Sequence, residues 1–303
     1  MSQVLRVGVV GAGVFGGYHA AKYAAMPGVV LAGVFDPHPE RAEALATRRG
    51  GAAFDSLEAL LEASDAVSIA SPASAHAGAA LAALRAGRHV YVEKPIATDL
   101  ADADAILGEA ARRGRVVACG FLERAMFRGM GLFSIRERPL RLEAVRLGPT
   151  SPRNLDVSVV LDLMIHDLDL ALAVTDAEPL AVEADGRSPV HDRLDEAEAE
   201  VNFDDGFIAV LRASRIAAER ERRMTLVYPS GEISVDFVAR TFSNTTGHPL
   251  TPAFRDPRAD PLGESLAAFV AAVRGEAPSP LANALDGAKA LDLALAVEQA
   301  VGR

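Results

Sequence analysis

The chain of 303 residues has a single cysteine, Cys119, so it cannot form an internal disulfide bond. This fits the reducing environment of the cytosol. The first residues, MSQVLRVGVVGAG, lack the basic segment, apolar core and cleavage site of a secretory signal. No apolar run reaches the length of a transmembrane helix, because glycine, histidine and lysine interrupt the richest stretches. We therefore expect a cytoplasmic protein that does not enter a membrane.

An excess of positive charge is also missing. The chain has 31 lysine and arginine residues against 41 aspartate and glutamate residues, which gives a formal net charge of -10. This balance argues against binding nucleic acid or an anionic membrane through bulk electrostatics, although a local arginine cluster can still hold phosphate groups. Half of the residues are hydrophobic and 24% are charged, as in ordinary globular proteins. The length predicts two domains rather than one.

Short β-branched segments alternate with alanine-rich helical segments over the first 120 residues. We expect strands at 5–10, 29–35, 65–70, 89–93 and 115–120, and helices at 14–25, 38–49, 56–63, 75–86 and 99–113. Most of these strands lack a two-residue alternation, which is typical of parallel strands covered by helices on both faces. Gly87 and Gly114 follow two of the helices at positions where helices commonly end. The pattern predicts an α/β domain with a doubly wound parallel sheet over residues 1–120.

The pattern changes after residue 120. One long helix is expected at 157–175, and alternating strands follow at 196–203, 206–214, 223–228 and 232–238. The tripeptides DDG (204–206) and PSG (229–231) are typical of hairpin turns. Residues 239–261 are rich in Thr, Asn, Pro and Asp and are expected to form a loop, before two amphipathic helices at about 262–274 and 282–301. We therefore predict a second α/β domain, residues 121–303, with a large and mostly antiparallel sheet.

The segment GAGVFG (11–16) follows a predicted strand and opens a predicted helix. In this setting Gly11 permits a tight turn, Gly13 lets the backbone approach a pyrophosphate, and Gly16 allows close packing of helix on strand. The first helical residues, Val14 and Phe15, present backbone N–H groups at the positive end of the helix dipole. The segment therefore predicts a dinucleotide site, and the alternative is a glycine-rich turn that binds nothing.

Asp36 ends the next predicted strand, twenty residues after Gly16. A carboxylate at this place can accept hydrogen bonds from both ribose hydroxyl groups, and it repels a 2′-phosphate. No basic residue follows it directly, although Arg41 lies five residues further on. We expect NAD to be preferred over NADP.

The tripeptide Glu93–Lys94–Pro95 stands at the end of the strand expected at 89–93. Ligands of open α/β sheets bind beyond the carboxyl ends of the strands, so Lys94 is expected near the nicotinamide. A lysine must lose its proton before it can act as a base, and burial and a positive nicotinamide ring both favour the neutral amine. The alternative is a surface lysine that caps the strand, with Pro95 ending it.

Four ionisable residues interrupt the apolar helix expected at 157–175: Asp162, His166, Asp167 and Asp169. Asp162 and His166 are four residues apart and share one face, and Asp169 continues the same stripe. Asp167 is offset by about 100° and is expected in solvent or at a domain junction. A histidine beside a carboxylate is a suitable proton acceptor near neutral pH. The alternatives are a buried core histidine, or a metal site for which a third strong ligand is not evident.

Four motifs taken together, in their order along the chain, resemble the Gfo/Idh/MocA oxidoreductases: GAGVFG, SPASAH (71–76), EKP and D-x-x-x-H-x-x-D. The resemblance covers essentially the whole chain. It implies an N-terminal Rossmann domain and a C-terminal α/β domain whose open sheet often mediates oligomers, and hence a homodimer or homotetramer. It also implies that Ser71, Pro72 and His76 form a loop on the cofactor side, and that Glu93 lies beside the cofactor.

The same resemblance implies roles for the residues that would meet a substrate. Lys94 matches the family's catalytic or substrate-binding lysine, and Asp162 and His166 match positions that contact the sugar at the carbon being oxidised. The segment GFLERAMF (120–127) and the helix are most similar to a branch that oxidises the 3-hydroxyl group of UDP-N-acetylhexosamines. The chain keeps Glu123 and Arg124 of that branch, and departs from it at three positions: Phe121, Ala125 and Met126.

Basic residues of the second domain are candidates for binding a diphosphate, because arginine makes bidentate contacts with phosphate. Arg153 and Arg215 are the preferred candidates, ahead of Arg146 and of the run RERR (220–223), which is expected on a solvated strand edge. We thus expect an NAD-dependent dehydrogenase of a sugar or nucleotide sugar, with Lys94 or His166 as the base. The alternatives are a dehydrogenase of free aldoses or cyclitols, and a non-catalytic, NAD-responsive regulatory protein.

Overall fold

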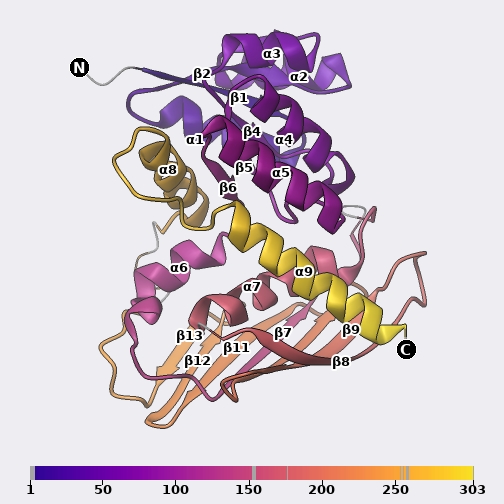
Figure 1. Ribbon diagram of the computed structural model, residues 1–303, viewed down its shortest axis with the longest axis vertical. Helices are drawn as coiled ribbons and strands as arrows, with labels where there is room; N and C mark the ends of the chain where they lie inside the picture. Colours follow the sequence, from indigo (N-terminus) through magenta and orange to yellow (C-terminus); the bar gives the residue numbers. More distant parts are fainter. Residues whose placement is uncertain are drawn as a thin grey trace. The chain divides into compact units, whose positions relative to one another are not determined.

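The computed structural model describes residues 4–151, 155–175, 177–252, 254, 256 and 259–302 of the chain (Figure 1). The chain divides into two compact units. The first unit consists of Met1–Leu122 and Asp260–Ala288, and the second of Glu123–Ala259 and Lys289–Arg303. The predicted boundary after residue 120 is two residues from the observed one. Residues 260–288, however, belong to the first unit, and not to the second domain as the sequence pattern suggests.

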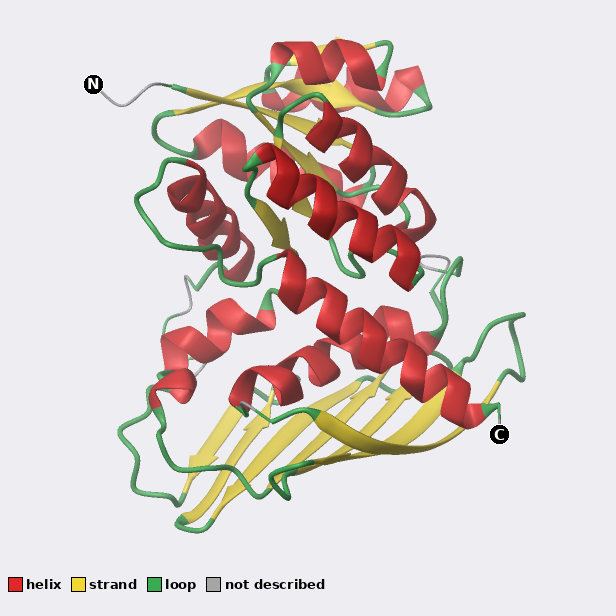
Figure 2. Ribbon diagram, viewed as in Figure 1, coloured by secondary structure: helices red, strands yellow, loops and turns green. Residues whose placement is uncertain are grey.

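A six-stranded parallel sheet forms the centre of the first unit, in the order β3-β2-β1-β4-β5-β6 (Figure 2). Its strands are β1 (Leu5–Val10), β2 (Val29–Phe35), β3 (Ala52–Phe54), β4 (Ala66–Ile69), β5 (His89–Val92) and β6 (Val117–Cys119). The sequence pattern predicts all of them except β3, which contains no β-branched residue. Strands β2 and β3 are added on one side of β1, and β4, β5 and β6 on the other side. The strand order therefore changes direction between β1 and β4, and ligands of such sheets bind at this switch point.

The helices of this sheet match their expected positions to within one residue. They are α1 (Val14–Ala25), α2 (Pro39–Arg49), α3 (Leu57–Ala63), α4 (His76–Arg85) and α5 (Leu100–Arg113). Side chains cap two of them: Ser56 accepts a hydrogen bond from the Ala59 N–H (3.1 Å), and Asp99 accepts one from the Asp102 N–H (2.9 Å). Gly114 ends α5 with a φ of 58°, a left-handed conformation that favours glycine.

Helix α8 (Pro261–Val273) returns to the first unit and completes its core. Phe269 is fully buried and packs edge-on against Tyr91 of β5, with 5.8 Å between the ring centroids. The Tyr91 hydroxyl group lies 3.0 Å from that of Ser265. After the helix, Arg274 donates a hydrogen bond to the Gly28 carbonyl (2.7 Å). The amphipathic pattern predicts the helix, but not the sheet that it covers.

The second unit contains a seven-stranded sheet in the order β13-β12-β11-β7-β10-β9-β8. Its strands are β7 (Arg141–Leu147), β8 (Pro179–Arg187), β9 (Glu196–Phe203), β10 (Ile208–Ser214), β11 (Glu221–Tyr228), β12 (Gly231–Asp236) and β13 (Thr241–Asn244). All neighbours are antiparallel except β7 and β10, which confirms the prediction of a mostly antiparallel sheet. The two predicted hairpin turns join β9 to β10 and β11 to β12. Strand β13, in contrast, lies in a segment that we expected to be a loop.

Helices lie on one face of this sheet. They are α6 (Glu123–Met130), α7 (Ile165–Val174) and the C-terminal part of α9 (Ala284–Val301) (Figure 2). Residues that point toward the helices, such as Leu142 and Leu211, are buried. Residues that alternate with them, such as Val145 and Val210, point to the opposite face and are only half-buried. No helix in the part of the chain that the structure describes is long and apolar enough to cross a membrane.

The helix expected at 157–175 begins with a π-helical turn, η3 (Val160–Met164), which continues into α7. The Ser158 hydroxyl group accepts hydrogen bonds from the backbone N–H groups of Val160 (3.1 Å) and Leu161 (3.2 Å). The Ile165 N–H bonds to the Val160 carbonyl, five residues back. A π turn holds one more residue than an α turn, so spacings derived from an ideal α-helix do not apply across it.

We expect Phe269→Ala to lower the free energy of unfolding by about 3–5 kcal/mol, because it leaves a cavity between α8 and the sheet. Leu180→Ala is the control, since Leu180 is 73% exposed and should change stability by no more than about 0.5 kcal/mol. Chemical denaturation followed by circular dichroism measures both. Equal, small effects would contradict the packing of α8 into the first core.

Candidate active site

The segment GAGVFG forms the turn between β1 and α1. Gly11 has a φ of 98°, and its N–H bonds to the Phe35 carbonyl (2.8 Å). A Cβ atom at Gly16 would clash with the Gly11 carbonyl oxygen, whereas one at Gly13 would meet no other atom within 4 Å. Gly13 is the N-cap of α1, and no side chain caps that end of the helix. The turn therefore leaves open space and unsatisfied N–H groups at a helix N-terminus, which fits a pyrophosphate.

Asp36 is buried at the end of β2. Its carboxylate accepts hydrogen bonds from the N–H groups of Ala12 (2.7 Å) and His38 (2.9 Å). It therefore fixes the glycine turn to the second strand. An ionised carboxylate offers about four acceptor positions, so two remain for ribose hydroxyl groups.

His76, at the start of α4, connects the segments that follow β4 and β5. Its ring nitrogens lie 2.9 Å from the Ser71 carbonyl (Nε2) and 2.7 Å from the Pro95 carbonyl (Nδ1). Burial lowers the pKa of His76, and the two carbonyl groups oppose this shift. His76 thus positions the SPASAH segment and does not reach toward a ligand itself. Within this segment, Pro72 precedes a short helical turn, η1 (Ala73–Ala75).

Glu93 follows β5 and is buried against α1. Its carboxylate lies 3.0 Å from Nε2 of His19, and Nδ1 of His19 lies 2.6 Å from the Ser68 hydroxyl group. A Cβ atom at Gly120 would come within 2.7 Å of the Glu93 carboxyl group, so a larger residue at position 120 would displace this carboxyl group. The sequence reasoning missed His19 and Ser68. The sequence signal that could have found them is a single histidine, His19, in the helix that follows the glycine turn.

The predicted cofactor residues meet at one edge of the first sheet. Gly11 follows β1, Asp36 follows β2, Ser71 follows β4, and Glu93 with the partly buried Lys94 follows β5. Since these strands are parallel, all of these residues lie at the carboxyl ends. Val14 and Phe15, in the first turn of α1, are exposed beside the glycine turn. The structure therefore brings the predicted nucleotide site together.

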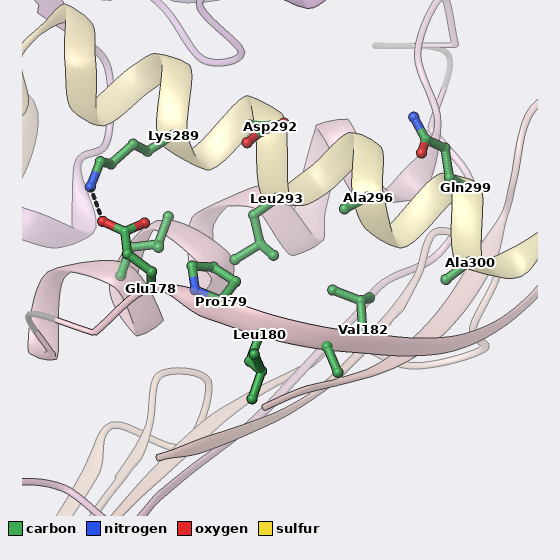
Figure 3. Close-up of a pocket in the computed structure, with 12 residues that line it drawn as sticks. Glu178, Pro179, Leu180, Val182, Lys289, Asp292, Leu293, Ala296, Gln299 and Ala300 are labelled. Atoms are coloured by element: carbon green, nitrogen blue, oxygen red, sulfur yellow. Dashed lines mark hydrogen bonds and ion pairs between the residues drawn. The ribbon is translucent and has the colours of Figure 1, made fainter. Parts of the chain in front are cut away.

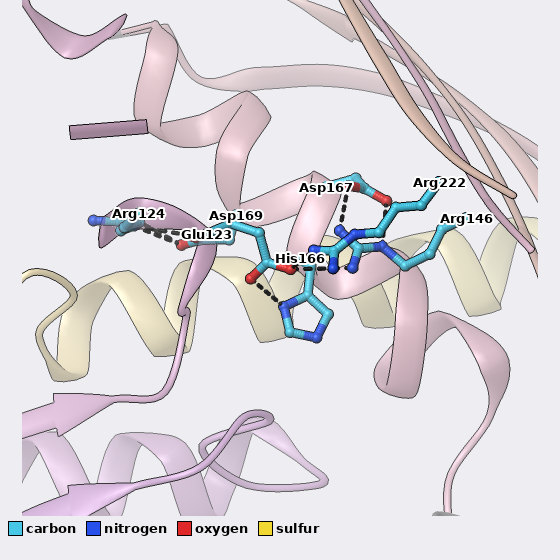
Figure 4. Close-up of polar contacts among 7 residues, drawn as sticks. All are labelled: Glu123, Arg124, Arg146, His166, Asp167, Asp169 and Arg222. Carbon is cyan, nitrogen blue, oxygen red and sulfur yellow. Dashed lines mark hydrogen bonds and ion pairs between the residues drawn. The ribbon is translucent and has the colours of Figure 1, made fainter. Parts of the chain in front are cut away.

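A second group of polar residues lies in the second unit, where α6 and α7 face the sheet (Figure 4). Nδ1 of His166 lies 2.8 Å from one carboxylate oxygen of Glu123. The other oxygen accepts hydrogen bonds from Arg146 of β7 (3.0 Å) and from Arg222 of β11. Burial alone would raise the pKa of Glu123, but His166 and the neighbouring arginines hold this pKa well below its ordinary value.

The other two acidic residues of α7 also form buried ion pairs. Asp167 is 7% exposed and accepts two hydrogen bonds from Arg146 (2.7 and 3.0 Å). Of the two places expected for it, solvent or a domain junction, the first is therefore wrong. Asp169 is 1% exposed and pairs with Arg124 of α6 (2.7 and 2.9 Å). Asp169 and His166 thus contact two adjacent residues of α6, Arg124 and Glu123. Arg124 and Asp169 bind each other inside the unit.

The candidates for binding a diphosphate have other contacts. Arg215 is buried, and its guanidinium group donates to the carbonyls of Val157 (2.7 Å) and Leu194 (2.8 Å), at the start of the helical segment that carries Asp162. The contact of Arg215 with a phosphate stays a prediction. Arg153 lies outside the residues that the structure describes.

The run RERR contributes one residue to the charge cluster. Strand β11 is an interior strand and not a sheet edge, which corrects the expectation. Arg222 pairs with Glu123 and lies over the Phe237 ring, 4.9 Å from its centroid. Arg223 pairs with Glu221 at the surface, as expected for a solvated residue. Among the described residues, no group of three His, Cys, Asp or Glu side chains could hold a metal ion.

A groove of about 540 Å³ lies elsewhere in the second unit, between α9 and the edge strand β8 (Figure 3). Leu180, Val182 and Leu293 supply its apolar lining, and Lys289 pairs with Glu178 at 2.8 Å. None of the predicted site residues lines it. The groove is therefore separate from the candidate site.

A glycine turn at the switch point of a parallel sheet, with a buried aspartate at the end of the neighbouring strand, is typical of a dinucleotide-dependent oxidoreductase. Family comparison agrees with this class. Residues 5–121 match the model of the oxidoreductase family with an NAD-binding Rossmann fold, and residues 148–234 match that of the GFO/IDH/MocA C-terminal domain. The chain belongs to the Gfo/Idh/MocA family, and NAD is its cofactor.

Individual relatives extend this likeness over the whole chain. The chain is 40% identical to UDP-N-acetylglucosamine 3-dehydrogenase of Acidithiobacillus ferrooxidans, over 98% of this chain and 97% of that protein. The solved structure of that enzyme, GnnA, has a TM-score of 0.88 at 38% identity and covers 99% of this chain and 98% of its own. Inositol 2-dehydrogenase of Streptomyces avermitilis is 37% identical over 60% of this chain and 56% of that protein.

The glycines of the turn allow a test of the cofactor site. We expect Gly13→Ala to keep the thermal stability but to weaken NAD binding at least about tenfold, because the methyl group enters the space that the pyrophosphate needs. Gly16→Ala should lower the melting temperature, because its Cβ clashes with backbone. Gly17→Ala, whose Cβ would make only an ordinary contact with Leu45, is the control. Calorimetry measures both properties, and unchanged NAD affinity in Gly13→Ala would refute the assignment.

Proposed function

We propose that the protein oxidises a secondary hydroxyl group of a sugar, the 3-hydroxyl group of a UDP-N-acetylhexosamine. The full-length similarity to UDP-N-acetylglucosamine 3-dehydrogenase carries this proposal. The chain also retains the acid–base residues that such a reaction needs, in Lys94 and in the His166–Glu123 pair. A cytoplasmic location remains a prediction from the sequence.

In the proposed reaction, the glycine turn and Asp36 would hold NAD, which would supply the hydride acceptor for the sugar carbon. Lys94 and His166 bind the reacting hydroxyl group, and one of the two takes its proton. Because Nδ1 of His166 contacts Glu123, Nε2 is the ring nitrogen that we propose meets the hydroxyl group. Asp162, four residues before His166, is proposed to bind the sugar beside it. Holding the carbon and the cofactor in near contact supplies much of the rate.

A dehydrogenase of free cyclitols is the second candidate, because an inositol 2-dehydrogenase is 37% identical over part of the chain. NADH formation with UDP-N-acetylglucosamine, glucose and myo-inositol separates the candidates. We expect turnover with the nucleotide sugar at the highest kcat/KM. Preference for myo-inositol would favour the second candidate, and NAD binding without oxidation of any of them would favour a regulatory protein.

We expect Lys94→Ala and His166→Ala each to lower kcat/KM by at least about a hundredfold, since each removes a group that binds or deprotonates the hydroxyl. NAD affinity should stay within about threefold of the parent, because the glycine turn is unchanged. Lys289→Ala is a matched control, since it removes a lysine from a surface ion pair with Glu178. Steady-state kinetics and calorimetry measure these effects. Full activity in both variants would refute the mechanism.

We also propose that the protein forms a homodimer or homotetramer through the face of the seven-stranded sheet opposite its helices. Half-buried Val145 and Val210 point to this face among charged neighbours. Val210→Arg should reduce the molar mass measured by light scattering, because it places a charge in the contact. Val4→Arg adds a charge at an exposed site of the first unit and should leave the mass unchanged. A monomeric parent protein would disprove this assembly.

A further inference from the structure

We propose that Glu123 is the positioning residue for His166: it accepts the Nδ1 proton and thereby makes Nε2 the proton acceptor. This inference rests on the proposed function, in which His166 meets the reacting hydroxyl group. It also reassigns a residue for which the resemblance to the nucleotide-sugar branch implies a contact with substrate.

The contacts of Glu123 leave little freedom to its carboxylate. One oxygen lies 2.8 Å from Nδ1 of His166, and the other accepts hydrogen bonds from Arg146 and Arg222. The residue is 6% exposed, so the carboxylate is held inside the unit rather than offered to a ligand. Three elements besides α6 fix its place: α7, β7 and β11.

These contacts decide which nitrogen of His166 carries the proton. An ionised carboxylate only accepts hydrogen bonds, so Nδ1 must be the donor. A neutral imidazole has one N–H group, so Nε2 is then unprotonated and can accept a proton from a hydroxyl group. Once it has done so, the adjacent carboxylate stabilises the imidazolium. A carboxylate that orients a histidine in this way is a recurring part of proton-transfer sites.

The charges of the cluster are balanced when His166 is neutral. Its carboxylates belong to Glu123, Asp167 and Asp169, and its guanidinium groups belong to Arg124, Arg146 and Arg222. Asp162 of η3, with Arg215 near it, is the further charged neighbour along the helix. Asp169 pairs with Arg124, and Asp167 pairs with Arg146, which also contacts Glu123. Glu123 in turn contacts Arg222 and His166. Glu123 is thus the carboxylate that responds to the charge on His166.

The test compares Glu123→Gln with Asp167→Asn in the full-length protein. Both variants remove one buried carboxylate charge and keep the side-chain shape, but Asp167 pairs with Arg146. We expect Glu123→Gln to lower kcat at least about tenfold with little change in KM. We also expect the acid limb of its kcat/KM profile to move to lower pH, because loss of the anion destabilises the imidazolium. Asp167→Asn should leave the position of that limb unchanged.

A second measurement does not require turnover. The protein contains 7 histidines, and ¹⁵N-histidine labelling with a His166→Gln variant for assignment identifies the His166 ring signals. Above the pH at which the ring titrates, we expect a proton on Nδ1 and none on Nε2. This readout decides the role of Glu123 even if the protein oxidises no sugar. Absence of sugar oxidation would refute the proposed function but not the role of Glu123.

Three results would overturn the inference. One is a proton on Nε2 of His166 in the parent protein. Another is a Glu123→Gln variant with unchanged kcat and an unmoved acid limb. The third is an equal shift of that limb in Asp167→Asn, which would point to the general charge of the cluster instead of one contact. Circular dichroism of each variant establishes that it is folded.

Discussion

The buried carboxylate of Glu123 is tolerable only because His166, Arg146 and Arg222 surround it. An unpaired charge inside a protein is costly, and removal of one partner from a buried pair is strongly destabilising. The partners of this carboxylate come from a helix and two sheet strands. The same contacts therefore hold α6 and α7 on the sheet and orient the ring of His166, so the packing and the proposed chemistry of the second unit cannot be separated.

Much of the first unit could be predicted from the sequence, because its information is local. Glycines with positive φ, capping residues such as Ser56 and Asp99, and β-branched runs fix elements over a few residues. The pattern is silent where an element depends on distant partners. The short strand β3 pairs with β2, and α8 joins a core formed more than a hundred residues earlier. The π turn before α7 could not be predicted, because apolar residues are equally compatible with an α turn and a π turn.

The candidate site was predictable to the same extent. The predicted nucleotide residues follow β1, β2, β4 and β5, which are neighbouring parallel strands, so position along the chain gives position in space. For the charged helix, periodicity gives the relative directions of Asp167 and Asp169 within α7, but not what faces them, and it does not apply across the π turn that contains Asp162. Asp167 was expected in solvent or at a domain junction, and its ion pair was not foreseen because Arg146 lies 21 residues away on a strand that was not predicted. Which carboxylate contacts His166 likewise depends on α6.

The return of α8 to the first sheet has a consequence for biosynthesis. Tyr91 and its neighbours are covered by residues such as Phe269, which leave the ribosome only after the whole seven-stranded sheet has been translated. The nucleotide-binding half is therefore interrupted in the chain by the other half, and a fragment that ends at Leu122 would expose an uncovered apolar face. Domains generally fold as units during synthesis. In this protein the core of the first unit is completed only after residues 123–259 have been synthesised.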